Sequence, residues 1–286
     1  MNFECFSEEI AAYIREKGYE VKIDTVNKNN GHSLTGVIMS KKGQSVRPII
    51  YLESYYDQFQ NGENMEDLVE SIVRTYKSTF FDLDMEYFKE YERVEKSIYI
   101  RLINFERNED LLEKVPHKRW HDLAAVLYSS LEVEGQKASI LLYDTHLKQW
   151  GKTFDEIFQT AKSNMKRDVP VILQNLVEIL PQQVGSMMPR EAPLMYVLSI
   201  QGFYYGAAAI LYSEEVKDLA DKLQCDLLIL PSSIHELLIL KDDHAREYEE
   251  YRMMVQKVNK TDIVPDELLS YSLYRYNREK AEVEMV

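Results

Sequence analysis

The strongest constraint on the fold is an apolar stripe at helical spacing that follows Asn64. Its members are Met65, Leu68, Val69, Ile72, Val73, Tyr76 and Phe80. Residues three and four apart lie on one face of an α-helix, and Asn64 with Asp67 three positions later is typical of a helix N-terminus. The stripe therefore predicts a long amphipathic helix, which must bury its apolar face against another element.

The segments before this stripe predict one more helix and three strands. Helical spacing runs over Asn2–Lys17, and Gly18 supplies a C-terminal stop. Apolar and polar residues alternate from Tyr19 to Thr25, the period of a strand with one wet face. Ser33–Ser40 and Val46–Leu52 have similar patterns. We expect a small antiparallel meander packed on two helices.

The C-terminal two thirds contain two similar runs of strand, turn, strand and helix. The first comprises Leu123–Leu131, Ala138–Tyr143 and a helix opened by Thr153. The second comprises Leu194–Ile200, Tyr204–Tyr212 and a helix capped by Ser213. These runs predict two ββα-like repeats, which are too few for a solenoid and favour one mixed sheet with helices on one face.

The fold class that follows is α/β (α+β), with a mixed, mainly antiparallel sheet and helices. The other predicted elements are strands at Ser97–Asn104, Asp226–Leu230, Glu236–Leu240 and about Tyr271–Tyr276, and helices at Glu106–Lys114 and Asp242–Val258. A boundary near residue 95 divides the chain into an N-terminal α+β region (1–95) and a ββα-repeat region (96–286). No Pro-, Gly- or Ser-rich linker marks it, so one compact unit is an open alternative.

Net charge and hydropathy indicate which classes of partner and which cellular compartment to expect. The chain has 34 basic and 48 acidic side chains, a net charge of -14. This excess repels phosphate backbones and anionic lipid, so we expect neither nucleic-acid nor membrane partners. Apolar runs stay far below the roughly 18 residues of a membrane span. Because the N-terminus has no basic and apolar signal pattern, we expect a cytoplasmic location.

No cofactor or metal motif is evident. Cys5 and Cys225 lie far apart and form no CxxC pair, and neither a P-loop nor GxGxxG occurs. His117 and His121 have the HxxxH spacing of zinc hydrolases, but Lys118-Arg119-Trp120 between them replaces the required glutamate with positive charge. The sequence thus predicts a basic segment here, and no cofactor or metal.

Five residues are weak candidates for a catalytic site. Asp122 could orient the imidazole of His121 for acid/base chemistry, although Asp122 more simply opens a strand. Ser232, Ser233 and His235 follow the Asp226–Leu230 strand, where open sheets often place binding groups. Without a GxSxG elbow, the simpler interpretation is a turn capped by one of these serines.

Two other groups of side chains stand out. Arg74, Lys77, Lys162, Lys166 and Arg167 are basic, and we interpret them as solvated helix faces. The twenty tyrosines exceed ordinary usage, and tyrosine is favoured at recognition surfaces. They gather at Tyr51/Tyr55/Tyr56, Tyr87/Tyr91 and Tyr271/Tyr274/Tyr276. The alternative is that they fill strand and core positions.

Three segments carry a family resemblance. They are Leu230–Glu236, the tail Leu269–Lys280, and His121–Ala124. Together they resemble DUF5688, an uncharacterised bacterial family common in gut clostridia, over nearly the full chain. Ser129–Lys166 and Gly206–Pro231 have a more distant similarity to the bacillus-type DUF1444 family. The resemblance implies a fold, and it implies no activity or catalytic residue.

The sequence favours a non-enzymatic protein-interaction or adaptor module over an enzyme, because no catalytic motif is complete and tyrosine is abundant. The alternative is a hydrolase-like enzyme with a site near His121, Asp122 and His235. Their proximity in a concave pocket would favour the enzyme, and dispersal would favour the adaptor.

Overall fold

The computed structural model describes residues 1–40, 49–79, 85–133, 136–179, 194–202, 204–231, 233–244, 247–261 and 263–286. The chain divides into two compact units. The first holds residues 1–86 and 131–138, and the second holds 87–130 and 139–286. Phe80, the first residues of the predicted strand at Val46–Leu52, and Ser232 lie outside the described residues.

The first unit is a meander with helices, as expected. Its strands are β1 (Glu20–Asn27), β2 (Ser33–Ser40) and β3 (Ile49–Tyr51), in the order β1-β2-β3 with antiparallel pairing. Its helices are α1 (Phe3–Glu16), η1 (Asn29–Gly31), α2 (Glu53–Gln60) and α3 (Met65–Thr79), and η2 (Met85–Lys89) follows. The side chain of Asn2 caps α1 by accepting from Cys5 N at 2.9 Å.

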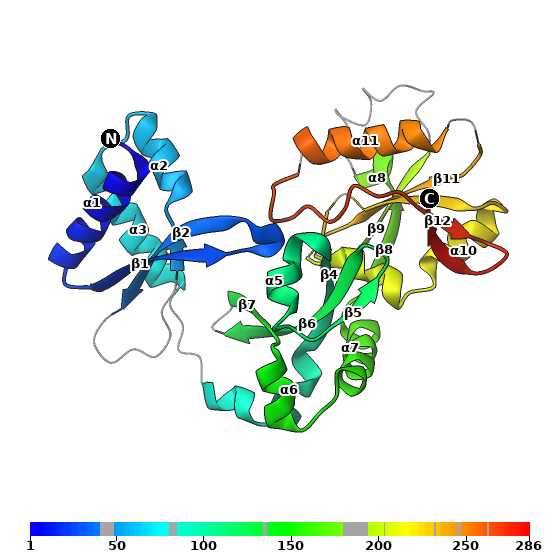
Figure 1. The fold of residues 1–286 in the computed structure, drawn as a ribbon, viewed down its shortest axis with the longest axis horizontal. Coiled ribbons are helices and arrows are strands. Elements are labelled where there is room, and N and C mark those ends of the chain that lie inside the picture. The colour runs from blue at the N-terminus through cyan, green and yellow to red at the C-terminus, as the bar shows by residue number, and fades with distance from the viewer. Residues whose placement is uncertain are drawn as a thin grey trace. The chain divides into compact units, whose positions relative to one another are not determined.

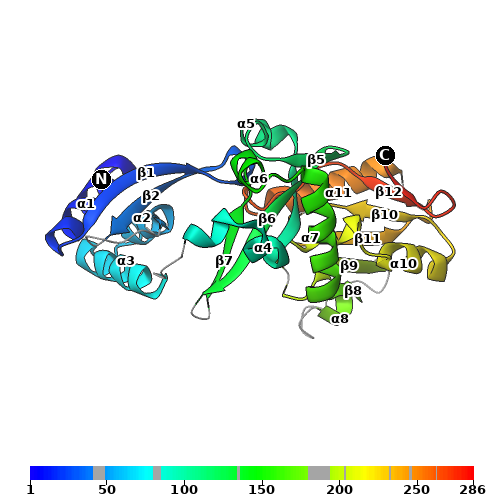
Figure 2. The same cartoon turned by 90° about the horizontal axis from the view of Figure 1, so that it is seen from below.

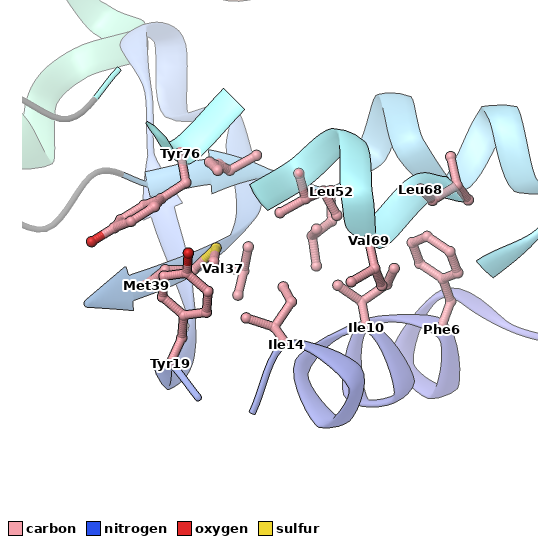
Figure 3. Packing of buried hydrophobic residues seen from close by; sticks show 12 residues of the cluster. Phe6, Ile10, Ile14, Tyr19, Val37, Met39, Leu52, Leu68, Val69 and Tyr76 are labelled. Carbon is pink, nitrogen blue, oxygen red and sulfur yellow. The ribbon is translucent and has the colours of Figure 1, made fainter. Parts of the chain in front are cut away.

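The core of this unit joins α1, α3 and the meander (Figure 3). Phe6, Ile10 and Ile14 lie one helical turn apart on α1 and are fully buried. Val37 and Met39 alternate along β2 and point to the same side. The apolar side chains that the helical spacing and the strand alternation identify therefore pack together in one core.

The second unit contains two sheets in the described part of the chain. The smaller has the order β4-β6-β5, with β7 also paired to β6, and residues 131–138 at the adjoining ends of β6 and β7 are counted with the first unit. The larger has the order β13-β12-β10-β11-β9-β8. The strands are β4 (Ile98–Asn104), β5 (His117–Trp120), β6 (Leu123–Val133), β7 (Gln136–Leu141), β8 (Val171–Asn175), β9 (Met195–Ile200), β10 (Leu227–Leu230), β11 (Leu237–Lys241), β12 (Tyr274–Asn277) and β13 (Glu282–Met285).

Helices cover both faces of the larger sheet (Figures 1 and 2). The helices of this unit are α4 (Tyr91–Val94), η3 (Glu95–Ser97), η4 (Glu106–Asn108), α5 (Glu109–Leu112), α6 (Asp144–Trp150), α7 (Phe154–Asp168), α8 (Leu176–Ile179), η5 (Gly206–Leu211), α10 (Glu215–Leu223) and α11 (Tyr248–Thr261). Leu228 and Leu230 of β10 pack with Tyr251 and Val255 of α11, while α10 lies on the other side. The expectation of helices on one face is wrong.

The fold class is confirmed as α+β with mainly antiparallel strands. The predicted strand at Tyr204–Tyr212 is wrong, because Gly206–Leu211 is a 3₁₀ helix. Tyr205 has φ 60°, which breaks an extended path at its start. The second ββα-like run therefore lacks its second strand.

Two helix starts also differ from expectation. Glu214, and not Ser213, occupies the N-cap of α10, and it makes no side-chain cap bond. The helix predicted from Asp242 begins at Tyr248. Asp242 N instead donates to Asp226 O at 3.0 Å, which continues the pairing of β10 and β11. Among the described residues, no helix is both long and apolar enough to cross a bilayer.

Candidate functional site

The most developed polar and aromatic assembly surrounds Tyr205 in the second unit. We call it the Tyr205 cluster: Arg101, Tyr128, Tyr204, Tyr205 and His235. Arg101 lies on β4 and Tyr128 on β6. The two other tyrosines lie in the turn after β9, and His235 lies between β10 and β11. Four separate segments thus supply one cluster.

Strand pairing brings the first side chains of the cluster to one face. Tyr99 and Arg101 are two residues apart on β4, so they point the same way. Tyr128 pairs directly with Tyr99 in the antiparallel register, and their ring centroids are 6.0 Å apart. The ring of Tyr205 stands edge-on to that of Tyr128 at 5.0 Å. The result is a continuous row of rings that ends at the β9 turn.

The turn after β9 is held in a strained conformation. Tyr205 has φ 60°, in the left-handed region of backbone conformation that residues other than glycine rarely occupy. Its backbone N–H donates to Nδ1 of His235 at 3.2 Å, and the two rings stack at 5.9 Å with an interplanar angle of 8°. A Cβ on Gly206 would lie 2.5 Å from His235 O, so only glycine fits here. The residues around the turn therefore fix its shape.

Arg101 supplies the charge of the cluster. Its Nη1 donates to the hydroxyl of Tyr205 at 3.0 Å, and its guanidinium carbon lies 5.1 Å from that ring's centroid. The buried Nε of Arg101 has no hydrogen-bond partner among the described residues. Burial favours the neutral form of Tyr205, but the charge of Arg101 and hydrogen bonds to the phenol oxygen hold its pKa below the ordinary value.

Tyr204 behaves in the opposite way. Its hydroxyl donates to that of Tyr205 at 3.1 Å, and the ring centroids are 4.1 Å apart. Burial, and the bond that it donates to Tyr205, raise the pKa of Tyr204 to about 12. Tyr204 is nevertheless 52% exposed, whereas Tyr205 is 7% exposed. The cluster therefore presents the rigid ring of Tyr204 on a buried Tyr205 whose oxygen accepts hydrogen bonds from Arg101 and Tyr204.

His235 is the one candidate from the sequence that lies in this cluster. Its Nε2 is 3.4 Å from Oε1 of Glu267, and its side chain is 18% exposed. Ser233 is used differently: its Oγ accepts from His235 N at 3.0 Å and donates to Glu236 Oε1 at 2.8 Å. That geometry is a local turn cap. Ser232 lies outside the described residues.

His121 and Asp122 belong to a second cluster. The carboxylate of Asp122 accepts from Ser270 Oγ at 2.5 Å, from Ser272 Oγ at 2.9 Å and from the hydroxyl of Tyr274. The ring of His121 packs at 5.4 Å from that of Tyr274. Burial and the Asp122 charge raise the pKa of Tyr274. In the described structure, no hydrogen bond or ring contact joins this cluster to His235.

The HxxxH pair and the tyrosine groups are the other features that the sequence singled out. His117 lies in the strand β5, so the HxxxH spacing does not fall on a helix. Its ring Nδ1 is within hydrogen-bond distance of Val115 O, at 2.9 Å. The described residues contain no group of three or more His, Cys, Asp or Glu placed to hold a metal ion. In the third tyrosine group, Tyr274 and Tyr276 are buried. The exposed Tyr204 was missed, because its segment has the pattern of a strand.

The fold and the clusters together define an α+β protein of mainly antiparallel sheets with a tyrosine-rich site. The model of the family of unknown function DUF5688 matches residues 2–278. The chain therefore belongs to this family. No curated protein and no solved structure matches it.

Proposed function

We propose that the chain is a bacterial cytoplasmic protein-interaction or adaptor module, and that it binds a partner protein through the Tyr205 cluster. One observation carries the proposal. Tyr204 is 52% exposed, while its hydroxyl and ring are fixed against a Tyr205 that is 7% exposed. Tyrosine is enriched among the residues that dominate interfaces, and a ring fixed by a buried neighbour offers a large amphipathic contact area.

The energetics support a binding role for such a ring. Association costs about 0.5–1.5 kcal/mol for each rotamer-rich side chain that it immobilises. Tyr204 is already held by Tyr205, and Tyr205 by Arg101 and His235. The ring thus offers a large amphipathic area whose conformation needs little further ordering. Tyrosine and arginine are also among the residues that most often dominate interfaces.

The test compares matched tyrosine variants. The tagged full chain, its Tyr204→Ala variant and its Tyr143→Ala variant are purified from the native host. Proteins that co-purify with the wild type are then produced separately, and their affinities are measured. Tyr143 is 37% exposed and serves as the control for loss of a surface tyrosine. An anchor residue is worth about 2 kcal/mol or more, so Tyr204→Ala should weaken binding about 30-fold or more.

The result can contradict the proposal in two ways. A partner whose affinity is the same for Tyr204→Ala and wild type does not use this surface. Equal losses for Tyr204→Ala and Tyr143→Ala would indicate general damage. The melting temperature of each variant is measured alongside. Because Tyr204 is half exposed, we expect its truncation to leave the fold intact.

A second candidate function is the hydrolase-like enzyme that the sequence suggested near His121, Asp122 and His235. Because His121 and Asp122 lie in the separate cluster with Tyr274, its site would centre on His235. The contact of His235 with Glu267 at 3.4 Å favours it, since a carboxylate next to an imidazole is common in acid/base sites. The lowered pKa of Tyr205 beside the same imidazole is a further point in favour. Purified protein is tested on ester, amide and phosphoester substrates. Activity lost in His235→Gln and kept in His117→Gln would support the enzyme.

A further inference from the structure

The outer edge of β5 is an open strand edge in the second unit. β5 lies at one end of the strand order β4-β6-β5 in the smaller sheet. Lys118 and Arg119 are neighbours on this strand, so their side chains point to opposite faces of the sheet. Both residues are exposed. An edge with an exposed residue on each face is accessible to another polypeptide chain.

The strand register shows which backbone groups this edge offers. Along an antiparallel strand, successive residues direct their backbone groups alternately to one side and to the other. Phe105 N donates to Asp122 O at 2.9 Å, so the even-numbered residues of β6 bond to β4 and the odd-numbered ones face β5. The partners of these odd-numbered residues are the even-numbered residues of β5. The N–H and C=O groups of His117 and Arg119 therefore point away from the sheet, and they make no backbone hydrogen bond to another described residue.

The side chain of Arg119 is held in place beside this edge. Its guanidinium carbon lies 4.3 Å from the centroid of the Phe105 ring, and its Nε donates to His121 O at 3.0 Å. Both Nη atoms are left without a hydrogen bond to any described residue. A guanidinium that is fixed on a ring needs little further ordering before it binds a carboxylate through its planar N–H groups.

The charge of the edge indicates which kind of chain it accepts. Neither Lys118 nor Arg119 forms an ion pair with an Asp or Glu that the structure describes. The whole chain, in contrast, has a net charge of -14. Like charges directly opposite each other destabilise strand pairing, so β5 of a second copy is disfavoured as a partner. A strand that carries carboxylates is favoured for the same reason.

We propose that an extended acidic segment of a partner protein adds to β5 as a further strand of the smaller sheet. Main-chain hydrogen bonds to His117 and Arg119 supply affinity, and side-chain contacts supply selectivity, as in other cases of strand addition. Two adjacent acidic residues in the segment place one carboxylate on each face, beside Lys118 and beside Arg119. This surface involves no residue of the Tyr205 cluster, so the inference is independent of the proposed function.

The test uses a short fluorescent peptide of valine and threonine with two adjacent glutamates at its centre. Its binding to the full chain is measured by fluorescence anisotropy. We expect saturable binding that weakens as salt is added, and slower hydrogen exchange at the Arg119 N–H in the complex. Cross-strand pairs of opposite charge are individually modest, so Lys118→Gln and Arg119→Gln should each weaken binding about two- to five-fold. A peptide with glutamine in place of glutamate should also bind more weakly.

Backbone variants separate strand addition from attraction by charge alone. Arg119→Pro removes an N–H that points outward, a position where edge strands tolerate proline. It should weaken binding about three- to ten-fold more than Arg119→Gln does. A peptide methylated on the backbone nitrogens that face β5 makes the same test on the wild-type chain, so the result does not depend on the folding of a variant. Lys148→Gln, which removes an exposed lysine of α6, and Tyr204→Ala should bind the peptide like wild type.

Three outcomes would overturn the inference. If the glutamate peptide does not bind, the charges of β5 serve only to protect the edge against pairing. If the methylated peptide binds as tightly as the unmodified one, the peptide is held by charge and not as a strand. Loss of peptide binding in Tyr204→Ala, with binding kept in Arg119→Pro, would place the peptide at the Tyr205 cluster, which supports the proposed function and contradicts this inference.

Discussion

Replacing Asp122 with alanine tests whether this residue is structural or belongs to a reactive site. In the structure its carboxylate accepts from Ser270, Ser272 and Tyr274. Tyr274 is fully buried and Ser270 is 1% exposed. Asp122→Ala would leave these two buried donors without an acceptor, at about 1–3 kcal/mol each. The expected loss in free energy of unfolding is therefore about 2–6 kcal/mol.

Two further variants serve as comparisons: Asp122→Asn is the conservative replacement, and Asp110→Ala is the surface control. The amide keeps one oxygen acceptor but loses the charge, and we expect a loss of about 1–2 kcal/mol. Asp110 is exposed on α5, so its replacement should change stability by less than about 0.5 kcal/mol. The expected loss in free energy of unfolding therefore decreases from Asp122→Ala to Asp122→Asn to Asp110→Ala, because each change leaves fewer buried donors without an acceptor.

The assay is urea denaturation followed by tryptophan fluorescence. The ring of Trp120 lies 5.3 Å from that of Tyr274, so its emission reports the packing around Asp122. A loss below about 1 kcal/mol for Asp122→Ala, with an unchanged dependence on urea, would refute the structural role. Loss of activity or of partner binding at unchanged stability would instead make Asp122 a functional residue.

Two further predictions concern pH and the β9 turn. Burial raises the pKa values of Tyr128, Tyr212 and Tyr274, so the folded chain keeps these protons where the unfolded chain loses them. The free energy of unfolding should be constant below about pH 10 and should fall above it by about 1.4 kcal/mol per pH unit for each tyrosine. Urea midpoints at pH 9–11 check this, and Tyr128→Phe should make the fall with pH less steep. Gly206→Ala would place a methyl group 2.5 Å from His235 O. It should cost about 1–3 kcal/mol in a thermal melt, and unchanged stability would contradict the geometry of the turn.

Local periodicity explains why the first unit was predictable. The predicted strand Ser33–Ser40 coincides with β2, and the apolar stripe after Asn64 coincides with α3 as far as Thr79. Both depend on residues close in sequence. The expected strand at Tyr204–Tyr212 failed because the alternation of apolar residues does not reveal the sign of φ at Tyr205.

The candidate site was predictable only in part, because it depends on strand register. Sequence patterns identified β4 and β6 as strands, and His235 as a candidate. The contact of Arg101 with Tyr205 joins residues 104 positions apart. The pairing of Tyr99 with Tyr128 places Arg101 on the face of the sheet where Tyr128 contacts Tyr205. No local pattern encodes that pairing, so Arg101 and Tyr204 could not be found from the sequence alone.

The His121–Asp122 cluster and the Tyr205 cluster each contain one strained residue, and the strain has a different consequence in each. His121 and Tyr205 both have positive φ, 54° and 60°, at a cost of about 1 kcal/mol or more each. At His121, the three bonds to the adjacent Asp122 offset that cost and connect distant parts of the chain. At Tyr205, the bonds to Arg101 and His235 offset it, and the outcome is an exposed Tyr204. The first strain is explained by folding. The second strain holds the half-exposed ring of Tyr204 against Tyr205, at 4.1 Å between ring centroids, which is the arrangement that the proposed interaction requires.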